Sequence, residues 1–112
     1  MAKTYHYGST TITVEYDQAS SLTLFVKDGA EQRSLNLSAF GLADPEGQEA
    51  ADIGANSWNL VPPPAVFCQA DDATMQQFSA DNPDLDLGQG SAEEIRRGWH
   101  HYWKIDQANW CP

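Results

Sequence analysis

Positive charge is absent from the middle of this chain. No lysine or arginine occurs between Arg33 and Arg96, a stretch that makes up more than half of the 112 residues. That stretch holds eleven of the sixteen carboxylates, so it accounts for the net charge of −10 at pH 7. A strong field of one sign attracts oppositely charged partners and repels like-charged ones. We therefore expect a protein partner with a basic surface, and no direct binding to nucleic acid.

Long apolar runs are absent as well. No segment approaches the roughly 18 apolar residues that a membrane span requires, and residues 1–6 lack the apolar core of a secretory signal. We expect no membrane association and a cytoplasmic protein, placed in the host cytoplasm if a phage encodes it. With 41% hydrophobic and 11% aromatic residues, the chain is too apolar for a disordered acidic tail. Its length favours a single domain spanning residues 1–112.

Cysteine is scarce, with only Cys68 and Cys111 in the chain. Their spacing fits no redox or zinc motif. A disulfide between them is possible, but without a secretory signal two free thiols are the favoured interpretation. The adjacent side chains of His100 and His101 project about 100° apart on a helix, so they do not readily chelate one ion. We predict no metal site and no cofactor.

Catalytic signatures are also missing. Serine, histidine and aspartate are present, but no local motif links a nucleophile to a base. The segment from Gly88 to Ser91 superficially resembles a phosphate-binding turn before a helix. Glu93 and Glu94 stand where a phosphate would lie, which argues against that interpretation. The sequence therefore favours a binding protein over an enzyme.

Residues 3–38 show the alternation that is typical of β-strands. Apolar side chains recur at every second position in three runs: Tyr5 and Tyr7; Ile12, Val14 and Tyr16; Leu22, Leu24 and Val26. Asp28-Gly29 predicts a tight turn into a fourth run. Phe25 points to the opposite face of the sheet, so we expect that face to be partly covered. The small hydroxyl side chains on that face suit a sheet edge to which another chain adds a strand. The ordinary β-propensity of threonine is the simpler explanation.

The middle of the chain is predicted to be irregular. Residues 44–52 suit a short helix, with a loop as the alternative, and the prolines at 62–64 require an extended backbone. Residues 65–68 form a short apolar run that suits one more strand. Residues 71–82 are expected to form a helix capped by Asp71 and stopped by Asn82-Pro83. Residues 84–87 alternate acid and leucine, so an extended backbone places the carboxylates on one side.

The C-terminal segment carries the clearest helix signal. Ser91 and Glu94 form a capping box, and we expect the helix to continue to about Asn109. At 100° per residue, one broad face is apolar, with Ile95, Trp99, Tyr102, Trp103 and Trp110. The opposite face holds the polar side chains of Arg97, His100, His101 and Lys104.

Together these patterns predict an α+β fold. We expect an N-terminal antiparallel β-meander of three to five strands, a short middle helix, and a long amphipathic C-terminal helix packed on the sheet.

The charge distribution favours a small acidic protein that binds a basic, nucleic-acid-handling partner and inhibits it. In size and acidity, though in no motif, the chain is similar to phage-encoded inhibitors of bacterial defence, including anti-CRISPR proteins that mimic DNA. An immunity protein that neutralises a toxin is one alternative. Another is a self-associating structural or accessory protein whose acidity serves only solubility. We expect the protein to be a monomer or a homodimer. The residues predicted to bind the partner are nine carboxylates and one tryptophan: Asp44, Glu46, Glu49, Asp52, Trp58, Asp71, Asp72, Asp81, Asp84 and Asp86.

Overall fold

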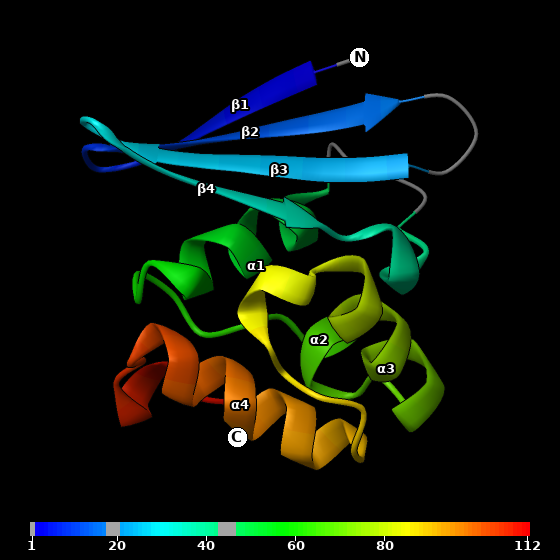
Figure 1. Cartoon of the computed structure of the whole chain (residues 1–112). Coiled ribbons are helices and arrows are strands. Elements are labelled where there is room, and N and C mark those ends of the chain that lie inside the picture. Colours follow the sequence, from blue (N-terminus) through cyan, green and yellow to red (C-terminus); the bar gives the residue numbers. More distant parts are fainter. Residues whose placement is uncertain (1, 18–20, 43–46) are drawn as a thin grey trace.

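The computed structural model describes residues 2–17, 21–42 and 47–112. The N-terminal part is a four-stranded sheet in which neighbours along the chain are also neighbours in space, all antiparallel (Figure 1). Its strands are β1 (Ala2–Tyr7), β2 (Thr10–Asp17), β3 (Ser21–Asp28) and β4 (Glu31–Asn36). The predicted meander is thus confirmed. Gly8 and Gly29 begin the two-residue turns after β1 and β3, and their φ angles of 64° and 62° suit these tight hairpins.

The two faces of the sheet differ as the alternation predicts. The inner face carries buried aliphatic side chains such as Ile12, Leu24 and Leu35. The outer face carries the cross-strand row Thr13, Phe25 and Ser34. We expected Phe25 to indicate partial cover over this face. Instead, every helix in the described part of the chain lies on the inner side, so no described helix covers the outer face that carries Phe25 (Figure 1).

The rest of the chain is mostly helical, with more helices than the single short one expected in the middle. The α-helices are α1 (Gln48–Ser57), α2 (Ala65–Cys68), α3 (Asp72–Asp81) and α4 (Ala92–Trp103). The described chain also forms three 3-10 turns: η1 (Ser38–Phe40), η2 (Pro83–Leu85) and η3 (Gln107–Asn109). No helix in the described ranges is long and apolar enough to cross a bilayer.

Helix α1 lies against the inner face of the sheet. The expected start of this helix at 44–46 falls outside the described residues, and its end at Ser57 lies well beyond the expected Asp52. The helix continues because small residues let it approach the strands. A Cβ atom added to Gly54 would lie 3.0 Å from the side chains of Leu24 and Val26. Glycine is therefore needed at this contact.

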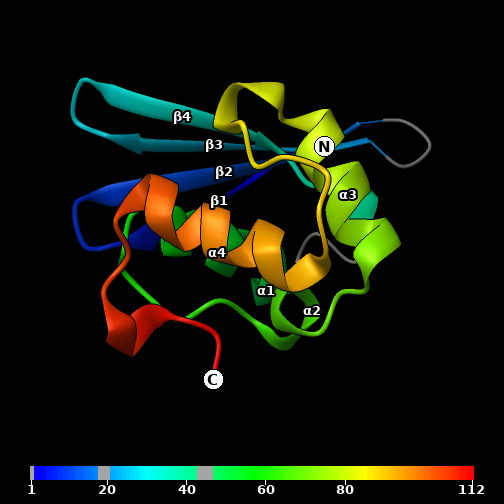
Figure 2. The ribbon, with the colours of Figure 1, turned by 60° about the horizontal axis from the view of Figure 1, so that its bottom comes forward.

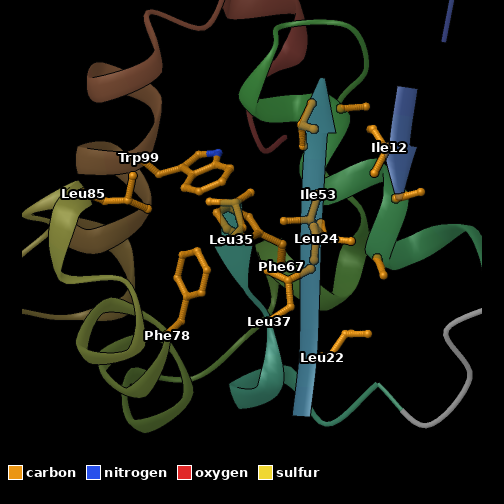
Figure 3. Close-up of a cluster of buried hydrophobic side chains, with 14 of the residues drawn as sticks. Ile12, Leu22, Leu24, Leu35, Leu37, Ile53, Phe67, Phe78, Leu85 and Trp99 are labelled. Atoms are coloured by element: carbon orange, nitrogen blue, oxygen red, sulfur yellow. The ribbon is translucent and has the colours of Figure 1, made fainter. Parts of the chain in front are cut away.

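The expected strand at 65–68 is wrong, because these residues form the single helical turn α2. Short apolar runs do not distinguish a strand from a buried helical turn, and the packing of Phe67 decides between them here. The Phe67 ring lies in the core 5.3 Å from Trp99 and 6.1 Å from Phe78, measured between centroids (Figure 3).

Helix α3 begins and ends where the sequence predicts. The Asp71 side chain accepts a hydrogen bond of 2.8 Å from the Thr74 N–H, and the helix stops at Asn82 before Pro83. The expected extended backbone at 84–87 is wrong. Residues 83–85 form the turn η2 instead, and Asp86 is left-handed with φ 50°.

Helix α4 has the predicted capping box. Ser91 Oγ accepts from Glu94 N–H at 3.2 Å, while Glu94 Oε1 accepts from Ser91 N–H at 3.5 Å. The helix packs against α3 (Figure 2). Trp103 at its end contacts the Arg33 guanidinium of β4. It ends at Trp103 rather than Asn109, because Lys104 adopts a left-handed conformation with φ 53°.

The C-terminal tail turns back across the helices after Lys104. Its Trp110 ring stacks on His100 with 4.8 Å between centroids, so His100 is 4% exposed rather than on an open polar face. Cys111 forms a disulfide with Cys68, with Cα atoms 5.6 Å apart. The expected free thiols are therefore wrong. The early end of α4 turns the tail toward α2, a geometry that sequence spacing does not reveal.

Candidate functional site

The described carboxylates of the stretch without basic residues fall into three groups. One group lies on α1 (Glu49, Asp52), a second at the N-termini of α3 and α4 (Asp71, Asp72, Glu93, Glu94), and a third at the end of α3 and on η2 (Asp81, Asp84, Asp86). Asp44 and Glu46 lie outside the described residues. We call the third group the acidic turn.

In the first group, Asp52 joins α1 to the first strand. Asp52 accepts a hydrogen bond of 2.8 Å from the Tyr7 hydroxyl, which in turn accepts one of 2.8 Å from Gln48. Burial, followed by the hydrogen bond to Asp52, raises the pKa of the Tyr7 hydroxyl well above its ordinary value. Asp52 is thus used inside the fold, whereas Glu49 beside it is exposed.

The second group caps two helices whose N-termini meet. Hydrogen bonds from the Thr74 hydroxyl and N–H lower the pKa of Asp71. Asp72 accepts a bond of 2.7 Å from the Ala92 N–H, which links the start of α3 to the start of α4. Glu93 pairs with Arg97 at 2.7 Å. These carboxylates mostly compensate helix N-termini.

The acidic turn differs because its charges face solvent. Asp84 and Asp86 are exposed, and the carboxylate of neither forms a hydrogen bond or ion pair with another described residue. Leu85 between them is only 6% exposed and points into the core, so it anchors the turn (Figure 3). The two carboxylates on either side of it are exposed. Asp81 accepts a bond of 2.8 Å from Gln77 one helical turn earlier.

Asn82 attaches the acidic turn to the sheet. Its Oδ1 accepts from the Asn36 N–H at 2.8 Å, and its Nδ2 donates to the Asn36 carbonyl at 2.8 Å. Nδ2 also donates to the Phe78 carbonyl at 2.8 Å. The sequence indicated Asn82 only as a helix stop, because nothing in its neighbourhood reports a contact 46 residues away.

A hollow of about 320 Å³ lies between the acidic turn and the edge of the sheet. Its lining comes from β3 and β4 on one side and from the end of α3 and η2 on the other: Thr23, Ser34 and Asn36; Asp81, Asn82, Pro83, Asp84 and Leu85. Figure 2 shows η2, in yellow, beside β4. The fold thereby brings two of the predicted carboxylates to a concave surface.

Trp58 lies far along the chain from the acidic turn and has a different environment. The guanidinium carbon of Arg33 lies 3.7 Å from the centre of the Trp58 ring and 4.0 Å from that of Trp103. Arg33 also donates to the Ser57 carbonyl, and burial lowers the pKa of its guanidinium. Trp58 therefore covers a half-buried cation of its own chain.

The other arginines are also engaged within the fold. Arg96 donates to the carbonyls of Phe67 and Ala70 at 3.4 and 3.0 Å. Arg97 forms, with Glu93, the one salt bridge found among the described residues. None of the three arginines is therefore paired with a carboxylate of the acidic turn.

In the part of the chain that the structure describes, no three histidine, cysteine, aspartate or glutamate side chains are grouped to hold a metal ion. The chain matches no known family model, and comparisons with curated proteins and with solved structures give no significant match.

Proposed function

We propose that this is a non-enzymatic binding protein that captures and inhibits a protein partner through the basic surface of that partner, using the acidic turn. The observation that supports this most is the position of Asp84 and Asp86. Both are exposed, and Leu85 and Asn82 hold the turn in place beneath them. A contact surface that is already ordered loses little conformational entropy on binding.

The charge balance supports the same proposal. Arg33, Arg96 and Arg97 are engaged with aromatic rings, carbonyls and Glu93, so they offer little competition for a partner. At a net charge of −10, long-range attraction accelerates encounter with a basic surface at low salt. Suitable partners are a nuclease, a nucleic-acid-guided complex of the kind that phage inhibitors target, or a basic toxin.

The proposed contact is smaller than a mimic of a whole DNA strand. Such a mimic needs one negative charge about every 3.4 Å along a continuous row. The described carboxylates of the stretch without basic residues instead lie on three different parts of the fold, and five of the six in the first two groups are bonded within it. We therefore assign the direct contact to the acidic turn, whereas the other groups contribute to the long-range attraction.

The test is affinity capture from an extract of the native host, followed by a salt series with the purified captured protein. Replacing Asp84 and Asp86 with lysine is expected to weaken binding at least about tenfold at low salt. Glu49→Lys and Asp106→Lys together form the matched control, because they change the same net charge on exposed side chains elsewhere. Equal losses for both pairs, or affinity that does not change with salt, would contradict capture by the acidic turn.

A second candidate function, self-association, is supported by the outer face of the sheet. No described helix covers this face, and Phe25 lies at its centre between Thr13 and Ser34 (Figure 1). Sedimentation equilibrium tests it. A dimer that persists at high salt and dissociates on Phe25→Glu would favour this function, and a monomer at all concentrations would exclude it.

A further inference from the structure

The outer edge of β4 has backbone groups that point away from the sheet. The two-residue hairpin after Asp28 makes Asp28 and Glu31 a hydrogen-bonded pair, and such pairs alternate along antiparallel strands. The N–H and carbonyl groups of Gln32, Ser34 and Asn36 therefore face outward. β4 is an edge of the sheet because its only strand neighbour in the described chain is β3 (Figure 1).

Asn36 shows directly that this edge accepts a partner. The Asn82 amide donates to its carbonyl and accepts from its N–H, both at 2.8 Å, in the manner of a residue on an adjacent strand. No described residue pairs in this way with Ser34 or Gln32. The edge is therefore closed at the C-terminal end of β4 and open along the preceding residues.

The hollow lies beside the open part of this edge. Ser34 and Asn36 line it from β4, while Asp81 and Asp84 line it from the opposite side. Its volume of about 320 Å³ suits one long side chain. Two carboxylates at its wall favour a side chain that ends in a cation.

We propose that an extended segment of a basic partner adds a strand to β4, pairing with Ser34 and Gln32, and inserts an arginine or lysine side chain between Asp81 and Asp84. Main-chain bonds to an open edge provide affinity, and the adjacent hollow provides selectivity. This inference rests on the proposed function and names the form of the contact.

The charges favour a basic segment over a second copy of this chain. Pairing β4 with β4 of another copy brings together two chains that each carry a net charge of −10, which disfavours that contact at low salt. The opposite edge of the sheet, β1, carries Lys3 and His6 and has no acidic turn beside it, so it favours a basic segment less than β4 does, although β4 also contains Arg33.

The test uses a short synthetic peptide of alternating threonine and arginine, blocked at both ends and labelled for fluorescence anisotropy at low salt. One matched peptide has alternate backbone amides N-methylated, and another has citrulline in place of arginine. N-methylation keeps the charge but removes strand pairing, whereas citrulline keeps the shape but removes the charge. Each change is expected to weaken binding about tenfold.

Protein variants test the same contact from the other side. Ser34→Pro removes the outward N–H without removing a bond to β3, and it is expected to weaken binding about tenfold. Thr4→Pro makes the equivalent change on the β1 edge and is expected to leave the dissociation constant within about twofold. Asp81→Asn with Asp84→Asn is expected to weaken binding about tenfold. Far-UV circular dichroism checks that each variant is folded.

The outcomes separate the two proposals. If the N-methylated peptide binds as tightly as its parent, strand addition is wrong while capture of basic partners stands. If the citrulline peptide binds equally well, the role of the hollow is wrong. Absence of binding to every arginine peptide contradicts both proposals, and a dimer that Ser34→Pro dissociates assigns the edge to a second copy instead.

Discussion

Removing the disulfide between Cys68 and Cys111 should be the most damaging change to stability that leaves the core intact. The bond closes a loop with a sequence separation of 43 residues. For a loop of this length, the loss of closure entropy in the unfolded chain corresponds to about 4 kcal/mol of stability at 25 °C. For a domain of about this size, that free energy lowers the melting temperature by roughly 15 °C.

The perturbation is the double variant Cys68→Ser, Cys111→Ser, compared with the wild-type protein in the presence and absence of reductant. Thermal and urea unfolding are followed by circular dichroism. The folded structure should survive, because the tail is also held by Asn56, whose Nδ2 donates to the Asn109 carbonyl at 2.9 Å, and by the stacking of Trp110 on His100. We therefore expect a large change in stability and a small change in the folded spectrum.

The reductant provides an internal control. Reduced wild type should match the double variant, and the double variant should not respond to reductant. Thiol titration of the denatured, unreduced protein should detect no free thiol. Two thiols per chain, or a melting temperature that falls by less than about 5 °C, would refute the argument from loop closure.

Three further predictions follow from buried polar contacts. Arg33→Lys should lower stability by about 1–2 kcal/mol in urea unfolding, because an ammonium cannot stack flat between Trp58 and Trp103. Asn56→Ala should lower the free energy of unfolding by about 2–4 kcal/mol in the same measurement. The Asn56 side-chain oxygen accepts a hydrogen bond of 2.7 Å from the Trp99 indole N–H, and its nitrogen donates to the carbonyls of Val61 and Asn109. Burial of the imidazole, and secondly the charge of Arg96, lowers the pKa of His100 in the folded protein. As the pH drops below about 6.5, the unfolded chain therefore takes up this proton more readily than the folded chain, and the free energy of unfolding should fall. His100→Gln should reduce this loss, measured as urea midpoints at acidic and neutral pH, while His101→Gln at an exposed position should not.

The sheet was predictable because its information is local. Each strand alternates within its own residues, and a one-residue shift would expose Ile12 or Leu24 to solvent, so the register follows from the pattern. The caps at Asp71 and Ser91 were predictable for the same reason. In each, a side chain bonds a backbone N–H three residues ahead.

The errors share a nonlocal cause. The turn α2 is helical because Phe67 packs among rings from α3 and α4, and α4 ends early because the tail must reach α2. His100 is polar, yet it is buried under Trp110, ten residues further along the chain. In each case the deciding partner lies outside the window in which helical or strand periodicity can be read.

In the candidate site, the sequence likewise does not reveal which carboxylates have partners inside the fold. Six of the nine described carboxylates in the stretch without basic residues accept hydrogen bonds or pair with an arginine inside the fold: Asp52, Asp71, Asp72, Asp81, Glu93 and Glu94. At the N-termini of α3 and α4, the positive ends of the helix dipoles offset part of the negative field. Asp84 lies within a single 3-10 turn and Asp86 directly follows it, so no dipole comparable to that of an α-helix offsets their charge. The outward field therefore depends less on the number of acids than on which of them lack a partner within the fold, and two of the three in this stretch that lack one, Asp84 and Asp86, lie on the acidic turn.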